Sequence, residues 1–182
     1  MVSSLPSHGS ILKKGDALNK RKLASWKPPL LGKFKLNFDG ASRGNPGLAG
    51  VGMVIVNHHT HIIHARCHAI GIQSNNFVEF KALSLGLELA ISLGIKDLII
   101  EGDYLVIIQS VLKRKSHCWQ FQYLLDLILQ QLEFFDSFFI THCFREIKRV
   151  ADFLANLAID NNAILRDVSS VEFPISVLEL LQ

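Results

Sequence analysis

The sequence has few cysteines and no long apolar run. Its three cysteines are widely spaced and form no CxxC pair, which argues against a disulfide framework and a CxxC metal site. No apolar stretch reaches the roughly 18–20 residues that a membrane span needs, so we expect no membrane partner. The first residues, MVSSLPSHGSILKKG, lack the basic-then-apolar order of a secretory signal. We therefore expect an intracellular protein, nuclear or cytoplasmic, and not a secreted one.

Charged residues are also scarce, at 19%, whereas apolar residues make up 49% of the 182 positions. This composition supplies enough apolar material for a core and excludes an intrinsically disordered chain. The formal net charge of +3 is the sum of two opposed parts. Residues 1–35 carry eight basic side chains against Asp16 alone, a net +7, and the remainder carries −4. The small total charge therefore does not decide for or against a polyanionic partner.

Residue patterns divide the chain into three parts. Residues 1–31 show little periodicity and include Pro28-Pro29, which cannot continue a helix, so we predict a basic flexible arm or linker. Ordered structure is expected over 32–161, and a C-terminal tail of open function over 162–182. A single domain with tails fits the length of the chain.

Strand-like and helix-like patterns alternate along the central part. Period-2 or short apolar runs predict strands at 33–39, 50–56, 61–70, 97–103 and 137–144, and apolar stripes predict helices at 74–95, 104–113, 119–134 and 149–160. The segment DGASRGNPG (39–47) has the composition of a turn. Three meander strands followed by strand–helix alternation predict an α/β fold. Its sheet would be mixed and five-stranded, with three antiparallel and two parallel strands, and flanked by helices.

Four carboxylates stand at the ends of these elements, at Asp39, Glu79, Asp103 and Asp152. Each has an ordinary alternative explanation. Asp39 could form an Asp-Gly turn, and Glu79 could be a capping acid three residues after Asn76. Asp103 could cap the helix that follows it, and Asp152 could complement the dipole of the last helix. The first and fourth strands are expected to be adjacent and parallel, so Asp39 and Asp103 would emerge side by side. If Glu79 and Asp152 reach the same edge, four acids converge there.

Four bare carboxylates would repel one another, because like charges raise each other's pKa. Divalent cations that prefer oxygen ligands resolve this conflict, and Mg²⁺ suits carboxylates together with phosphate and water. Two such ions about 4 Å apart can activate a water molecule and stabilise the leaving oxygen of a phosphodiester. The pattern therefore predicts hydrolysis of a nucleic-acid backbone with two Mg²⁺ ions, for which Mn²⁺ is an alternative.

Four segments stand in the order and spacing of the type 1 ribonuclease H family. They are DGASRGNPG (39–47), SNNFVEF (74–80), IIEGD (99–103) and RVADFLANLA (149–158). The chain most closely resembles the ribonuclease H-like domains of plant non-LTR retroelements and related host genes, over about residues 26–160. The resemblance implies a ribonuclease H-like fold and an endonuclease that cuts the RNA strand of an RNA–DNA hybrid, its nucleic-acid partner.

By the same resemblance, the catalytic and metal-binding acids are Asp39, Glu79, Asp103 and Asp152. Asp39 would bridge both ions, Glu79 and Asp103 would hold one ion, and Asp152 would complete the other. Substrate binding is assigned to Gly40, Ala41, Ser42, Asn45, Asn75 and Asn76. Uncharged amides and backbone N–H groups can meet 2′-hydroxyls in the wide minor groove of a hybrid. The ordinary alternative is that the asparagines only form a turn and a helix cap.

Two departures from the family pattern leave the activity open. Tyr104 follows the third acid, where family members often carry a small residue, and the connection before the last acid shrinks to residues 145–149 without a histidine. A catalytically weak or inactive nucleic-acid-binding module derived from a retroelement is therefore the first alternative. A protein-interaction domain, suggested by the positive mean hydropathy, is the second. The oligomeric state stays open.

Overall fold

The computed structural model describes residues 28–116, 118–142, 145–168, 173, 174, 176 and 179. Most of the predicted basic arm and ten of the 21 residues of the predicted tail lie outside the described residues. The strands are β1 (Phe34–Gly44), β2 (Gly47–Val56), β3 (Ile62–Gln73), β4 (Asp97–Gly102), β5 (Ser137–His142) and β6 (Arg166–Asp167). The helices are α1 (Asn75–Ser92), α2 (Leu105–Lys113), the 3₁₀ turn η1 (Trp119–Phe121), α3 (Gln122–Leu132) and α4 (Arg145–Asn161).

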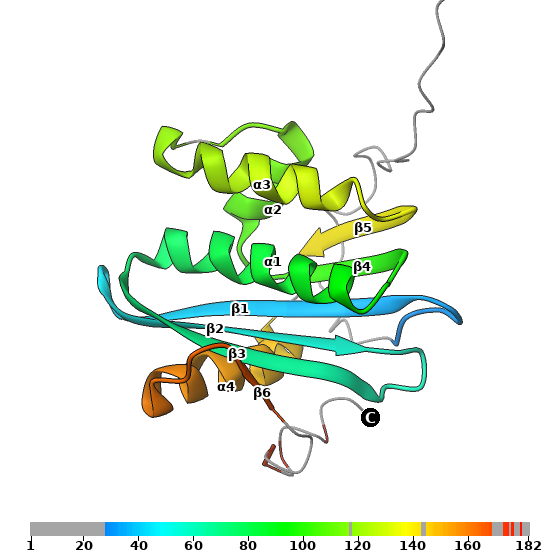
Figure 1. Cartoon of the computed structure of the whole chain (residues 1–182), viewed down its shortest axis with the longest axis horizontal. Coiled ribbons are helices and arrows are strands. Elements are labelled where there is room, and N and C mark those ends of the chain that lie inside the picture. The colour runs from blue at the N-terminus through cyan, green and yellow to red at the C-terminus, as the bar shows by residue number, and fades with distance from the viewer. Residues whose placement is uncertain are drawn as a thin grey trace, which may run out of the picture.

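The sheet is mixed, as predicted, with strand order β5-β4-β1-β2-β3-β6 (Figure 1). β1, β2 and β3 form the antiparallel meander, and β4 runs parallel to both β1 and β5. The predicted count of five strands is wrong, because β6 adds a sixth in the described part of the chain. β6 pairs with β3 through only two residues, which is too short to produce a period-2 pattern in the sequence.

The first strand extends beyond its predicted end. β1 continues to Gly44, and all its residues from Lys35 onward pair with β2. The predicted turn over 39–47 therefore shrinks to Asn45 and Pro46. Gly47 permits this tight return, since a Cβ at that position would lie 2.2 Å from the carbonyl oxygen of Arg43. As a consequence, β1 and β2 form a ribbon that continues past the position of Asp39, with β3 paired along its β2 side.

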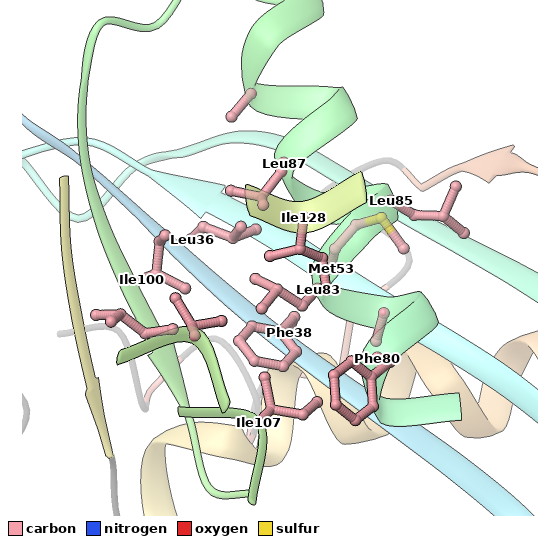
Figure 2. Packing of buried hydrophobic residues seen from close by; sticks show 14 of the residues in the cluster. Leu36, Phe38, Met53, Phe80, Leu83, Leu85, Leu87, Ile100, Ile107 and Ile128 are labelled. Atoms are coloured by element: carbon pink, nitrogen blue, oxygen red, sulfur yellow. The ribbon is translucent and has the colours of Figure 1, made fainter. Parts of the chain in front are cut away.

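Two apolar clusters hold the helices on opposite faces of the sheet. Leu36 and Phe38 of β1 pack in one cluster with α1 and α3, as Figure 2 shows for the side that α1 covers. Val54 of β2 packs in the other cluster with Val150 and Leu154 of α4. Because neighbouring strand residues face opposite sides, the side chain of Asp39 belongs to the α4 face. Figure 1 shows α1, α2 and α3 on one side of the sheet and α4 on the other.

Helix α1 begins and ends close to the predicted positions. Ser74 is the N-cap, and its hydroxyl oxygen accepts a hydrogen bond of 3.4 Å from the backbone N–H of Phe77. Gly94 follows the last turn with φ of +71°, the left-handed conformation that commonly ends a helix. The predicted apolar stripe is buried, including Val78 and Leu89.

The later elements differ from their predicted limits. The helix predicted at 119–134 is η1 followed by α3, and the helix predicted at 149–160 begins four residues earlier, at Arg145. Residues 145–149 are therefore part of α4 and not a loop connection. β5 ends at His142, and the last two residues of its predicted span lie outside the described residues. Within the described part of the chain, no helix is long and apolar enough to cross a membrane.

Candidate active site

Asp39 lies near the middle of β1, next to the point where α4 crosses the sheet. It is 1% exposed and pairs with Gly52 of β2. A Cβ on Gly52 would lie 2.2 Å from the carbonyl oxygen of Ala151 and 2.6 Å from the backbone nitrogen of Ala155. Only glycine therefore lets α4 pack this closely on β2. The carboxylate of Asp39 is placed by two packed elements, which restricts its position.

Glu79 is brought to the same place by α1. It is 7% exposed and lies in the second turn of the helix. A Cβ on Gly40 would lie 2.7 Å from Cγ1 of Val78 and 2.9 Å from the backbone nitrogen of Glu79. The glycine after Asp39 therefore allows the start of α1 to rest directly on β1. This packing gives Gly40, predicted as a substrate-binding residue, a structural role as well.

Asp103 follows the end of β4, which pairs in parallel with β1. Asn37 of β1 is the register partner of Glu101 of β4, and Asp39 and Asp103 each lie two residues beyond this matched pair. β1 continues past this point, whereas β4 ends at Gly102, so Asp39 lies beside the carboxyl end of β4, the kind of place where ligand sites gather in open α/β folds. The predicted side-by-side emergence of these two acids is present.

The three acids form a compact group. One carboxylate oxygen from each of Asp39, Glu79 and Asp103 can be chosen so that all three lie within 4.8 Å of one another. Oxygen donors at this separation, two of them from buried residues, are a ligand set that suits a hard divalent cation such as Mg²⁺. The residues present therefore fit the predicted kind of metal site.

The ordinary explanations for these acids do not hold. Asp39 lies inside a strand and not in a turn. The N-cap of α1 is Ser74, so Glu79 is two positions too late to be the acid of a capping box. The N-cap of α2 is Tyr104 and not Asp103. Three carboxylates placed in this way could hold a metal ion.

Asp152 differs from the other three. It was predicted in the first turn of the last helix, but it is the eighth residue of α4, because that helix begins at Arg145. It is exposed, lies outside the group of three, and its Oδ1 accepts a hydrogen bond of 3.2 Å from Nδ2 of Asn156. Asp152 directly follows Ala151, whose carbonyl oxygen lies against Gly52, the β2 partner of Asp39. Helix α4 therefore brings Asp152 toward Asp39. Its role as a metal ligand stays a prediction.

The predicted substrate residues line the ribbon and the start of α1. Gly40, Ala41 and Ser42 lie on β1, Asn45 in the turn, and Asn75 and Asn76 are the first two residues of α1. The hydroxyl of Ser42 donates to the carbonyl oxygen of Gln73 at 2.9 Å, which ties the ribbon to the end of β3. Oδ1 of Asn45 accepts the backbone N–H of Asn75 at 3.1 Å. The turn and the start of α1, 30 residues apart in the chain, are thus joined.

Two features near the acids were not predicted from the sequence: a hydrogen bond of Tyr104 and a buried ion pair. The phenol of Tyr104 donates to Oδ1 of Asn76, and burial, followed by the negative charge of Glu79, raises the pKa of that phenol. Nζ of Lys35 lies 2.7 Å from Oε1 of Glu101, and both side chains are largely buried. The sequence gives no distinct sign of this ion pair, because Lys35 stands at a polar position of the alternating pattern over 33–39.

Several known proteins are similar to this chain in sequence. Residues 37–158 match the family described as reverse transcriptase-like. The chain is 37% identical over 138 residues to ribonuclease HI of Halobacterium salinarum, covering 71% of this chain and 66% of that protein. It is 33% identical over 141 residues to a putative ribonuclease H protein of Arabidopsis thaliana, covering 75% of this chain and 22% of that protein. The chain thus spans only part of each relative's length.

Solved structures agree with the sequence relatives. The crystal structure of ribonuclease H1 from Halobacterium salinarum superposes with a TM-score of 0.68 at 34% identity, covering 71% of this chain and 98% of that chain. LC11 ribonuclease H1 in complex with an RNA/DNA hybrid gives a TM-score of 0.65 at 27% identity, covering 71% and 98%. The family match includes all four predicted acids. The chain therefore belongs to the reverse transcriptase-like family and has the type 1 ribonuclease H fold.

Proposed function

We propose that this protein is an endoribonuclease that hydrolyses the RNA strand of RNA–DNA hybrids with the help of divalent metal ions. The observation that carries the proposal is the group of Asp39, Glu79 and Asp103, whose carboxylate oxygens lie within 4.8 Å of one another. A relative at 37% identity named ribonuclease HI supports the reaction, and a similar structure solved with an RNA/DNA hybrid supports the substrate.

Two Mg²⁺ ions are the proposed cofactor, and Mn²⁺ is an alternative. Asp39, Glu79 and Asp103 would hold the metal, and Asp152 would contribute from α4. Bound divalent ions would supply an activated water molecule and neutralise charge that develops on the phosphodiester. The protein's own part is to keep three like-charged groups in place before metal binds. The close packing of Gly40 under α1 and of Gly52 under α4 supports that role.

The substrate would lie along the ribbon and the start of α1. Asn45, Asn75 and Asn76 are exposed there, beside the acids, and none of them is the N-cap of α1. Uncharged amides at the edge of an anionic site contact sugar and base edges without adding charge. A phosphate of the RNA strand would then reach the acids only when metal is bound, because both are negatively charged.

A labelled RNA–DNA hybrid incubated with Mg²⁺ tests the proposal. The wild-type protein should cut the RNA strand and leave a DNA duplex intact, and a chelator should stop the reaction. Asp39→Asn should lower the rate by about 100-fold or more, because even the outer partners of metal ligands contribute about 10–100-fold. Asp126→Asn is the matched control, since Asp126 is exposed on α3 and accepts a hydrogen bond of 2.8 Å from Nε2 of Gln122 on the same helix.

A nucleic-acid-binding module without cleavage is the second candidate. The position of Asp152 outside the group of three favours it, and so does a bulky Tyr104 beside Glu79. The same experiment separates the two candidates. Hybrid that is bound but not cut, by wild type and Asp39→Asn alike, would establish the module. Hybrid that is neither bound nor cut at low salt would exclude both.

A further inference from the structure

Tyr104 joins two elements at the edge of the acid group. It directly follows Asp103 and is the N-cap of α2, while Asn76 is the second residue of α1. The Tyr104 hydroxyl donates a hydrogen bond to Oδ1 of Asn76 across 28 positions of sequence. Tyr104 is half-buried, whereas Asn76 is exposed. The contact therefore connects a fixed side chain to one that faces solvent.

This contact decides which end of the Asn76 amide is available. An asparagine side chain carries an acceptor oxygen and a donor NH₂ group. Helix capping does not use the Asn76 side chain, because Ser74 is the N-cap. With its oxygen held by Tyr104, the amide offers its NH₂ group outward. Asn45 is arranged in the same way, since its oxygen accepts the N–H of Asn75 at 3.1 Å.

We infer that Tyr104 is a positioning residue that orients the Asn76 amide as a hydrogen-bond donor toward the minor groove of a bound hybrid. The inference rests on the proposed function and adds a residue to it. Acceptor atoms in that groove are the 2′-hydroxyl oxygens, purine N3 and pyrimidine O2. A freely rotating amide would present donor and acceptor equally, whereas an oriented one is prepared for acceptors alone. Tyr104 thereby acts on substrate affinity and not on the metal.

A double-mutant cycle tests this coupling. Tyr104→Phe, Asn76→Ala and the double variant are compared, with Tyr123→Phe as the matched control on the exposed side of α3. Binding of a fluorescent hybrid is measured by anisotropy in an Asp39→Asn background that does not cut, and KM and kcat are measured with Asp39 intact. Tyr104→Phe should weaken binding by about three- to tenfold, the effect of one hydrogen bond, and raise KM while kcat stays within about twofold.

The double variant carries the decisive comparison. It should bind no more weakly than Asn76→Ala alone, because Tyr104 acts through Asn76. Effects that multiply, or a Tyr104→Phe variant that equals wild type, would overturn the inference. Loss on Tyr104→Ser but not on Tyr104→Phe would do the same, since ring contact would then matter and not the hydroxyl. Melting temperatures near that of wild type confirm that each variant is folded.

The outcome is distinguishable from a failure of the proposed function. If wild type cuts the hybrid and Asp39→Asn does not, the proposed function holds whatever Tyr104→Phe does. If wild type neither binds nor cuts the hybrid, the proposed function fails and the role of Tyr104 fails with it.

Discussion

The middle of the sheet and its outer edge use the same chemical groups in opposite ways. At the middle, Asp39, Glu79 and Asp103 gather three carboxylates within 4.8 Å. At the outer edge, where β6 pairs with β3, Oδ1 of Asp167 lies 2.6 Å from Nε of Arg66 and 2.8 Å from Nε2 of His64. One region collects like charge, and the other neutralises it locally. The middle therefore presents a group of carboxylates that could hold a cation, whereas Asp167 at the outer edge is already paired with protein cations.

Burial separates the two regions further. The ion pair of Lys35 and Glu101 lies on the same face as Asp39, with 5% and 12% of the side chains exposed. The Asp167 side chain at the outer edge is 57% exposed. Charges are costly in a buried place unless they are paired, whereas solvent screens them at the surface. The same type of contact should therefore have very different effects on stability at the two places.

Removing one partner of the inner ion pair should have the largest effect. Lys35→Met keeps the apolar stem of the side chain but leaves Glu101 without its cation, and we expect a loss of about 3 kcal/mol in the free energy of unfolding. Lys35→Met/Glu101→Leu should recover most of this loss. Arg66→Met at the outer edge should cost less than about 1 kcal/mol. Urea denaturation at pH 7 measures each value, and equal losses at both places would contradict the contrast.

Adding a methyl group to a glycine should give the next largest effect. Gly52→Ala places a Cβ 2.2 Å from the Ala151 carbonyl oxygen, so α4 must move, at a cost of about 2 kcal/mol or more. Gly71→Ala near the outer edge meets nothing within 4 Å and strains only a backbone φ of +75°, at about 1 kcal/mol. Thermal unfolding followed by circular dichroism compares them. A greater loss for Gly71→Ala would show that α4 does not depend on this close approach.

The next largest effect should come from metal binding, which should depend on the three acids at the middle and not on Asp167 at the outer edge. Mg²⁺ at ten times its Kd should stabilise wild type by about 1.4 kcal/mol, or raise Tm by about 5 °C, because the ion binds the folded state. Glu79→Gln should abolish this increase. Glu133→Gln, an exposed change at the C-terminal end of α3, and Asp167→Asn at the outer edge should both keep it. An unchanged Tm for wild type with Mg²⁺ and with Mn²⁺ would argue against the metal site.

Topology made much of the inner cluster predictable from the sequence. Period-2 and helical patterns located the elements, and the parallel pairing of the first and fourth strands brought Asp39 and Asp103 together. The convergence of these two acids with Glu79 is present in the structure. Their catalytic roles stay a prediction. Asp152 was placed wrongly within its helix, because α4 begins over a charged segment whose pattern resembles a loop.

Contacts that depend on register or on distant segments could not be predicted. The Lys35–Glu101 pair requires the stagger of β1 against β4, which no local pattern contains. The bond from Tyr104 to Asn76 requires the starts of α1 and α2 to meet. β6 forms only because residues 166–167 reach the free edge of β3, since its own sequence is too short for a strand pattern. Long-range packing decided each of these features.

The smallest predicted effect concerns pH at the outer edge. The hydrogen bond from Arg66, and then the one from His64, hold the pKa of Asp167 below its ordinary range. A lowered carboxyl pKa stabilises the fold above the unfolded pKa of about 4, and this contribution disappears as the pH falls through the folded pKa. Because Asp167 is exposed, its size should be less than about 0.5 kcal/mol.

Asp167→Asn isolates that contribution. The difference in unfolding free energy between wild type and Asp167→Asn should be present above about pH 5 and shrink toward zero below about pH 4. High salt should reduce it at every pH, because solvent ions screen exposed pairs. A difference that grows as the pH falls would mean that the carboxyl group is more stable protonated. The outer edge would then be an acid-sensitive site and not the self-neutralised counterpart of the inner cluster.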